Sequence, residues 1–225
     1  MSQTYCALSE LKTWLGLSGS GQDDNLNASI KSASSSIAKF CGRQFDIDST
    51  VQTRLYDCEF LDYAFVDDIA TTTGLIVKTL NADGSVHETL TINTDFLLAP
   101  YNADKLDPVI PFDKIVMNIE RSGKVLPVEH RQGLQITAKF GFPSVPDDVK
   151  QAALIQSARY FQRKNSPMGF SGNPETGQAP IMFLSKLDPD VQTMVKHYKK
   201  STITLASGRP YVGLVAIENN RQYGV

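Results

Sequence analysis

The side chains that could carry out catalysis are few and widely separated in this chain of 225 residues. The three histidines, His87, His130 and His197, lack the H-x-x-x-H spacing and the nearby glutamate of a zinc protease. Serines are plentiful near the N-terminus, but no G-x-S-x-G elbow presents one of them as a nucleophile. Catalytic triads can also assemble from distant residues, so an enzyme or ligand-binding module with a dispersed site remains an alternative. Its expected wall is the acidic region from Asp57 to Asp68.

Metal and cofactor motifs are not found either. The glycine-rich stretch 16–21 lacks the Lys-Ser/Thr of a phosphate-binding loop, and we interpret it as a linker. The cysteines are widely spaced without a C-x-x-C unit, and we expect reduced thiols at Cys6, Cys41 and Cys58. The acid pairs do not follow the spacing of a calcium loop, and we assign caps or solvated loops to Asp46/Asp48, Asp67/Asp68 and Asp147/Asp148. We therefore predict no metal and no cofactor.

The charge pattern argues against a tight, sequence-independent grip on nucleic acid. The formal net charge is -2, and the Lys and Arg residues are scattered among acids. The N-terminus lacks the pattern of a signal peptide, and no apolar run approaches the roughly 18 residues of a membrane span. We expect a soluble protein that is made in the cytoplasm and does not contact the membrane.

Four segments show the periodicity of amphipathic helices. Apolar residues recur at helical spacing over residues 8–15 and 23–41, and Gly16 and Gly42 are expected to end these helices. Pro146 with the acids after it suits the first turn of a third helix that runs to about Lys164. Its apolar set is too broad for one stripe, so it should pack on two sides. A fourth helix is expected over residues 188–200.

The middle of the chain changes to the period of two that is typical of strands. Segments 74–80, 85–92, 115–120 and 134–140 are predicted strands, and the turn residues 81–84 favour a hairpin between the first two. Residues 99–111 are an expected loop, and so are residues 165–180, which are rich in Pro and Gly.

Together these patterns predict an α+β fold with a small helical bundle of about four helices as its core. Residues 1–50 and 143–200 would supply the helices, and residues 51–142 an inserted antiparallel β-rich subdomain. Residues 201–225 would form an extended C-terminal tail. This tail is more apolar than a solvated tail should be, and its apolar residues are Ile203, Leu205, Tyr211, Val212, Leu214, Val215 and Ile217.

Several segments resemble the head-to-tail connector, or adaptor, proteins of long-tailed bacteriophages. The first two are YCALSELKTWL at residues 5–15 and FCGRQF at residues 40–45. The likeness is closer for FGFPSVPDDVKQAAL at residues 140–154, continued by RYFQRKNSP at residues 159–167. LDPDV at residues 187–191 adds a weaker match. The strand-rich middle is similar only in general character.

This resemblance implies a structural protein without catalytic residues. It implies a homo-oligomeric ring beneath the portal vertex, expected to be twelvefold like the portal, with DNA passing through the centre. The implied partners are the portal protein and a neck stopper or tail-completion protein. The implied location is the capsid–tail junction of the virion, after assembly in the host cytoplasm. The first rival interpretation is another neck component, such as a stopper or tail-completion protein.

Two sets of residues are candidates for these contacts. We expect the apolar tail residues named above to hold the portal or a neighbouring subunit by adding an extended segment to it. Arg159, Arg163 and Lys164 are candidates for ring or lumen contacts. The favoured interpretation of these three residues, however, is that they offset the negative C-terminal end of the third helix.

Overall fold

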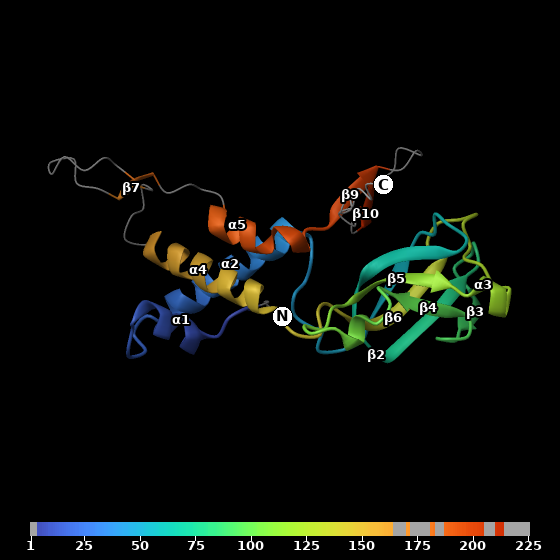
Figure 1. Cartoon of the computed structure of the whole chain (residues 1–225), viewed down its shortest axis with the longest axis horizontal. Coiled ribbons are helices and arrows are strands. Elements are labelled where there is room, and N and C mark those ends of the chain that lie inside the picture. The colour runs from blue at the N-terminus through green and yellow to red at the C-terminus, as the bar shows by residue number, and fades with distance from the viewer. Residues whose placement is uncertain (1–3, 164–169, 172–180, 183–186, 205–209, 214–225) are drawn as a thin grey trace, which may run out of the picture.

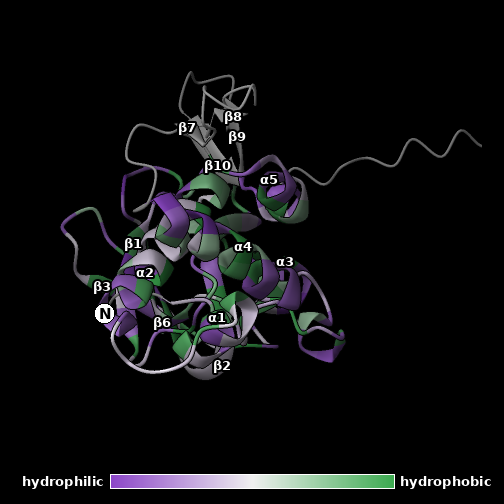
Figure 2. Cartoon of the chain, turned by 90° about the vertical axis from the view of Figure 1, so that its left-hand side faces the viewer, coloured by the Kyte–Doolittle hydropathy of each residue, from purple (hydrophilic) through white to green (hydrophobic). Residues whose placement is uncertain are grey.

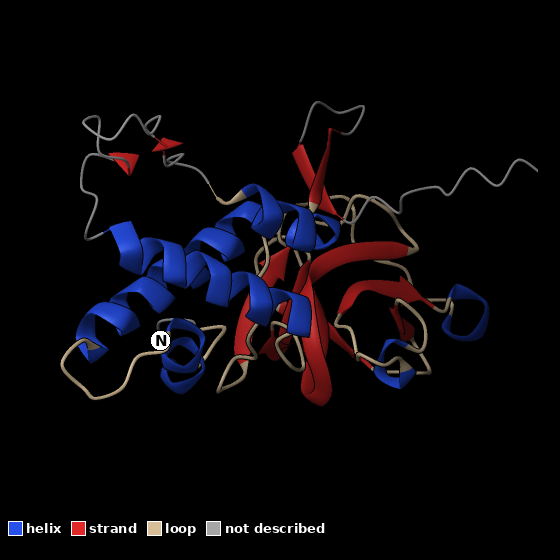
Figure 3. Cartoon of the chain, turned by 60° about the vertical axis from the view of Figure 1, so that its left-hand side comes forward, coloured by secondary structure: helices blue, strands red, loops and turns tan. Residues whose placement is uncertain are grey.

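The structure is a computed structural model that describes residues 4–163, 170–171, 181–182, 187–204 and 210–213. It confirms the predicted α+β fold. A group of helices and a large antiparallel sheet lie beside each other as two bodies (Figures 1 and 3). Each body encloses a hydrophobic cluster of its own.

The helical body contains four helices near the predicted positions. These are α1 (Leu8–Leu15), α2 (Asp23–Cys41), α4 (Asp147–Arg163) and α5 (Pro189–Val195). α4 contacts the other three, so the prediction that this helix packs on more than one side is confirmed. Figure 2 shows hydrophobic and hydrophilic residues on different sides of α5, as expected for a helix with one face against the core.

Small residues and glycine caps explain how these helices pack and end. α4 buries Ala152 and Ala153, which let α2 approach closely. Gly16 and Gly42 end α1 and α2 in the left-handed conformation, which glycine adopts without a Cβ penalty. α5 begins at the predicted Asp-Pro, where the carboxylate of Asp188 accepts a hydrogen bond from the backbone N–H of Asp190.

The large sheet has six antiparallel strands. They are β1 (Gln52–Tyr56), β2 (Tyr63–Leu80), β3 (Val86–Leu90), β4 (Phe96–Ala99), β5 (Phe112–Met117) and β6 (Leu134–Phe140). The order is β1-β6-β2-β5-β4, and β3 pairs with the far end of β2. The long β2 pairs with β5 along its first half and mainly with β6 and β3 along its second half. β6 alternates buried and half-buried residues as predicted, because one of its faces covers the core.

Several details of the middle region differ from the sequence prediction. β1 was not predicted as a strand, and β2 begins at Tyr63, well before the expected start at residue 74. The strand expected over residues 115–120 ends at Met117, and Ile119–Ser122 forms the short helix α3, which Gly123 ends in the left-handed conformation. β4 was not predicted as a strand, because its four residues are too few to show a period of two.

The C-terminal part continues from α5 through a 3₁₀ turn, Lys196–Tyr198, into a small hairpin. This hairpin pairs β9 (Ser201–Thr204) with β10 (Pro210–Gly213) and lies above the junction of the two bodies in Figure 1. Inside the expected loop 165–180, Phe170–Ser171 forms β7, which pairs with β8 (Ile181–Met182). The rest of that loop lies outside the described residues. In the described ranges, no helix is long and apolar enough to cross a bilayer.

Candidate assembly interface

The predicted partner-binding residues lie partly on the β9–β10 hairpin. Ile203 is on β9, and Tyr211 and Val212 are on β10, where Tyr211 pairs with Ile203 and Val212 with Thr202. The described part of the expected tail is therefore two paired strands and not one extended segment. The other four predicted contacts lie outside the described residues: Leu205, Leu214, Val215 and Ile217.

The predicted ring or lumen residues occupy the end of α4. Arg159 donates from Nη1 to Oδ2 of Asp188 at 2.6 Å, and both side chains are half-buried. Because Asp188 also caps α5, this contact joins α4 to the start of α5. Arg163 is in the last turn of α4, and Lys164 lies outside the described residues. Their contacts with a ring neighbour or with DNA stay predictions.

A buried ion cluster that the sequence did not reveal connects the helical body to the sheet. Arg43 follows α2, and its Nη1 donates to Oδ1 of Asp68 on β2 at 2.7 Å. Its Nη2 lies 3.8 Å from Oδ2 of Asp113 on β5. The side chains of Arg43 and Asp68 are only 3% and 4% exposed. One guanidinium thus joins α2 to two neighbouring strands, and the low dielectric around it strengthens these interactions.

The carboxyl groups of this cluster have shifted pKa values. Burial raises the pKa of Asp68 and of Asp113, although Arg43 and Lys200 act in the opposite direction. For the neighbouring Asp67, burial also favours the neutral form, but the hydrogen bond from Arg54 and the charge of Lys200 outweigh it and lower the pKa. Removal of Arg43 or Lys200 would therefore raise the pKa of the buried carboxyl groups of Asp68 and Asp113 further.

Lys200 ties the C-terminal hairpin to this cluster. Its Nζ lies 3.6 Å from Oδ1 of Asp67 and 3.9 Å from Oδ1 of Asp68, and its side chain is 7% exposed. Its backbone N–H donates to the carbonyl of Cys41, the last residue of α2. Since β9 begins at Ser201, the root of the hairpin is fixed at the junction of the two bodies.

The chain segments that connect the two bodies also cross at close range. The N–H of Gly141 donates to the carbonyl of Asp68, and the N–H of Asp48 donates to the carbonyl of Phe140. Gly141 has φ +108°, and a Cβ there would lie 1.9 Å from the carbonyl oxygen of Asp46. Only glycine fits this crossing, because any side chain would collide with backbone.

An apolar cleft of about 190 Å³ lies beside the same junction. Pro100, Ile110 and Pro111 line it from the sheet body, and Phe142 and Tyr198 from the helical side. The ring of Phe142 packs against Phe45 at 4.9 Å between centroids, and Tyr198 packs against both, so this wall is firmly held. Arg43 and His197 also border the cleft.

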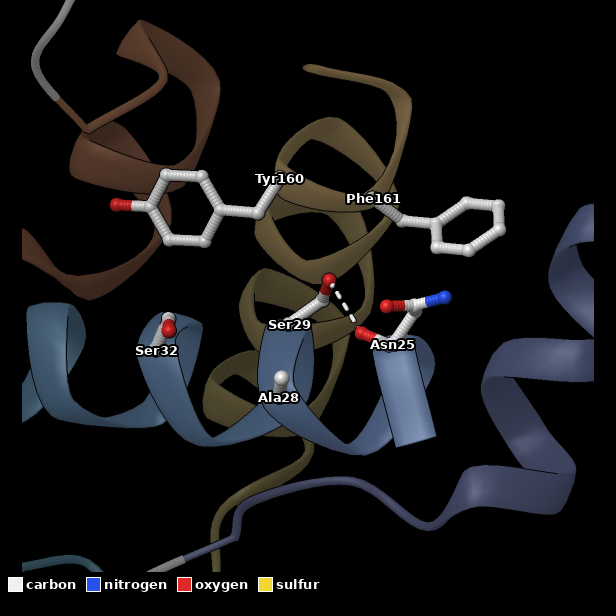
Figure 4. Close-up of a pocket in the computed structure, with 6 residues that line it drawn as sticks. All are labelled: Asn25, Ala28, Ser29, Ser32, Tyr160 and Phe161. Atoms are coloured by element: carbon white, nitrogen blue, oxygen red, sulfur yellow. Dashed lines mark hydrogen bonds between the residues drawn. The ribbon is translucent and has the colours of Figure 1, made fainter. Parts of the chain in front are cut away.

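A shallow groove lies between α2 and α4 (Figure 4). α2 contributes Asn25, Ala28, Ser29 and Ser32, and α4 contributes Tyr160 and Phe161. Ser29 is occupied by a hydrogen bond to the carbonyl of Asn25. The described lining consists of small and polar residues of α2 and two aromatic residues of α4, with no carboxylate, cysteine or histidine. The hydroxyl of Tyr160 is hydrogen-bonded to Ser36, so the groove does not pair an acid with a base.

The acidic region proposed as an alternative ligand site is engaged in structural contacts. Asp57 accepts a hydrogen bond from the N–H of Gln132. Asp67 and Asp68 lie on β2 and form ion pairs with Lys200 and Arg43, so their assignment to a cap or solvated loop was wrong. In the described part of the chain, no three His, Cys, Asp or Glu side chains come together as a metal site.

Comparisons with known proteins agree with the resemblance seen in the sequence. Residues 5–80 match the family model described as phage gp6-like head-tail connector protein. The predicted resemblance to the head-to-tail connectors is thereby confirmed for this part of the chain, which runs from the N-terminal helices to the end of β2.

The whole fold is similar to a chain in a structure described as the neck of an empty GTA particle computed with C6 symmetry. The two chains are 16% identical, with a TM-score of 0.54, and the alignment covers 91% of this chain and 94% of that chain. At this identity the likeness concerns the fold alone. No curated protein gives a significant match.

Proposed function

We propose that this protein is a structural connector subunit that forms a ring between the portal vertex of a capsid and the tail. The observation that carries the proposal is the match of residues 5–80 to the head-tail connector family. A fold shared over 91% of the chain with a neck protein supports the same role. The descriptions of the family and of the similar structure name a connector and a neck, and neither names a reaction.

The ring would form from copies of this chain, with DNA passing through its centre. A ring needs a heterologous interface, in which one surface of a copy meets a different surface of the next. We propose twelve copies, matching the portal; the C6 symmetry named for the similar neck is compatible with that number. The ring would lie at the capsid–tail junction of the virion, after assembly in the host cytoplasm.

The β9–β10 hairpin is the proposed partner-binding element. Among the described residues, β9 and β10 pair only with each other. A two-stranded hairpin is at best marginally stable in water, whereas adding a strand from a partner supplies backbone hydrogen bonds. Lys200 would hold the root of the hairpin in place while the strands engage the portal or a neighbouring subunit.

A chain that ends at Lys200 tests this proposal. It should fold, because the described buried residues of both hydrophobic clusters precede Lys199. It should fail to co-sediment with isolated portal. The matched control keeps the full length but replaces residues 201–213 by a Gly/Ser segment, and it should fail equally. Undiminished binding by the shortened chain would show that the hairpin is not the contact.

The remaining candidate is another neck component, such as a stopper or tail-completion protein, because the similar structure is described only as a neck. Such a protein would bind the connector ring and not the portal. Pull-down with isolated portal distinguishes the two roles, since a stopper should be recovered only when the connector ring is also present.

A further inference from the structure

The apolar cleft between the two bodies has the size and lining of a side-chain binding site. Its volume of about 190 Å³ is slightly larger than the roughly 150 Å³ apolar cavity that can hold a benzene molecule. Pro100, Ile110, Pro111, Phe142 and Tyr198 present mainly carbon atoms to it. Transfer of one branched aliphatic side chain into such a site is favourable by the hydrophobic effect.

The path of the chain brings its C-terminal segment to this cleft. Tyr198 lines the cleft, and β9 leaves from Ser201, three residues later. β10 is antiparallel to β9, and Gly213 pairs with Ser201, so the chain returns to the root of the hairpin. The Cα atoms of Gly213 and Tyr198 are therefore at most about 16 Å apart.

The residues that follow Gly213 have suitable chemistry and sufficient reach. The sequence continues as Leu214, Val215, Ala216 and Ile217. In an extended segment Val215 and Ile217 point to the same side. Ile217 is four residues beyond Gly213, so its Cα can lie up to about 14 Å from that of Gly213, which is enough to bring its side chain over the cleft; Val215 reaches only about 7 Å.

We propose that residues 214–217 dock in this cleft of their own chain, with Ile217 inserted, before the subunit meets its partner. This deepens the proposed function and rests on it in one respect: the same residues would leave the cleft when the hairpin joins the portal or a neighbouring subunit. The cleft would then cover these apolar residues until assembly. Partner binding would be coupled to their release from the junction of the two bodies.

Disulfide trapping in the full-length chain tests the docking. Ile110→Cys combined with Ile217→Cys should oxidise to an intramolecular disulfide in dilute protein, because bridged Cα atoms must come within about 7 Å. The control combines Ile217→Cys with Leu61→Cys; Leu61 is 51% exposed and lies beside the opposite end of β5. Cys6, Cys41 and Cys58 are buried, so they should not compete.

The expected result is cross-linked monomer that forms several-fold faster for the cleft pair than for the control pair. Equal rates would overturn the proposal. Cross-linked dimers, with a yield that rises with protein concentration, would also overturn it, because the segment would then come from a second copy.

Hydrogen exchange gives a second readout that does not depend on cysteine chemistry. In the full chain, Val215→Asn with Ile217→Asn should accelerate amide exchange around Ile110 and Tyr198, whereas Arg221→Asn should not. Unchanged exchange in the double variant would contradict docking. Portal binding is measured separately: trapping without portal binding would refute the connector role alone, and portal binding without trapping would refute the docking alone.

Discussion

The substitution Arg43→Met should destabilise the whole chain, because it removes the central cation of the buried ion cluster. Met keeps most of the side-chain volume, so the loss reports on charge and hydrogen bonding more than on packing. Without Arg43, Asp68 and Asp113 stay buried, and Lys200 at 3.9 Å from Asp68 is the remaining described cation within ion-pair distance of Asp68.

The expected magnitude follows from the geometry. Removing one partner of a buried ion pair costs about 3–5 kcal/mol, since it leaves an uncompensated charge. We expect about 3 kcal/mol at neutral pH, near the lower limit, because Lys200 compensates in part.

The cost should also depend on pH. Burial already raises the pKa of Asp68 and Asp113, and loss of Arg43 raises it further. For a carboxyl group with a raised pKa in the folded state, its contribution to stability is greatest below the ordinary aspartate pKa of about 3.9. This contribution is lost as the pH rises through the raised pKa. The deficit of the variant relative to the native chain should therefore be largest near neutral pH and shrink on acidification.

Urea unfolding followed by circular dichroism measures this difference at several pH values. Lys150→Met is the matched control, because its ion pair with Asp147 is solvent-exposed and should contribute no more than about 1 kcal/mol. A loss below about 1 kcal/mol for Arg43→Met, or a deficit that grows toward acidic pH, would refute the reasoning about the cluster.

Three further substitutions test other parts of the junction and of the helical body. Gly141→Ala should lower the free energy of unfolding by more than about 3 kcal/mol, because its Cβ would collide with the Asp46 carbonyl. The control Gly21→Ala has open space around it and should change the free energy little in the same urea assay. Equal effects of the two substitutions would contradict the close crossing at Gly141. Asp188→Ala should cost about 2 kcal/mol in thermal unfolding, because it removes both the cap of α5 and the partner of Arg159, and a neutral result would show that neither contact stabilises the fold. Lys200→Met should loosen the root of the hairpin, because it removes the ion pairs of Lys200 with Asp67 and Asp68. Portal binding in co-sedimentation should become clearly weaker, while the melting temperature falls little. Unaltered portal binding would show that the ion cluster does not contribute to assembly.

The helices were predictable from local signals. Their apolar residues recur at helical spacing, and Gly16, Gly42 and the Asp188-Pro pair mark ends that the structure confirms. α4 was recognised as central because its apolar set spans more than one face, and it contacts three other helices. These features depend on neighbours in the sequence.

The ion cluster was not predictable in the same way. Arg43, Asp68, Asp113 and Lys200 are far apart in the sequence and meet only when two bodies pack together. A weak signal was present, since each of the two acids has an apolar neighbour in the sequence: Ile69 follows Asp68, and Phe112 precedes Asp113. Charges at such positions are rarely buried without a partner, but the sequence does not identify the partner. The close approach at Gly141 is hidden for the same reason, because it depends on backbone from another segment.

Negative-stain microscopy of the protein mixed with its isolated portal tests the central claim most directly. We expect an added ring on the portal with a continuous central channel, and loss of that ring for the chain that ends at Lys200. Portal particles that remain bare in the presence of excess full-length protein would contradict the connector role.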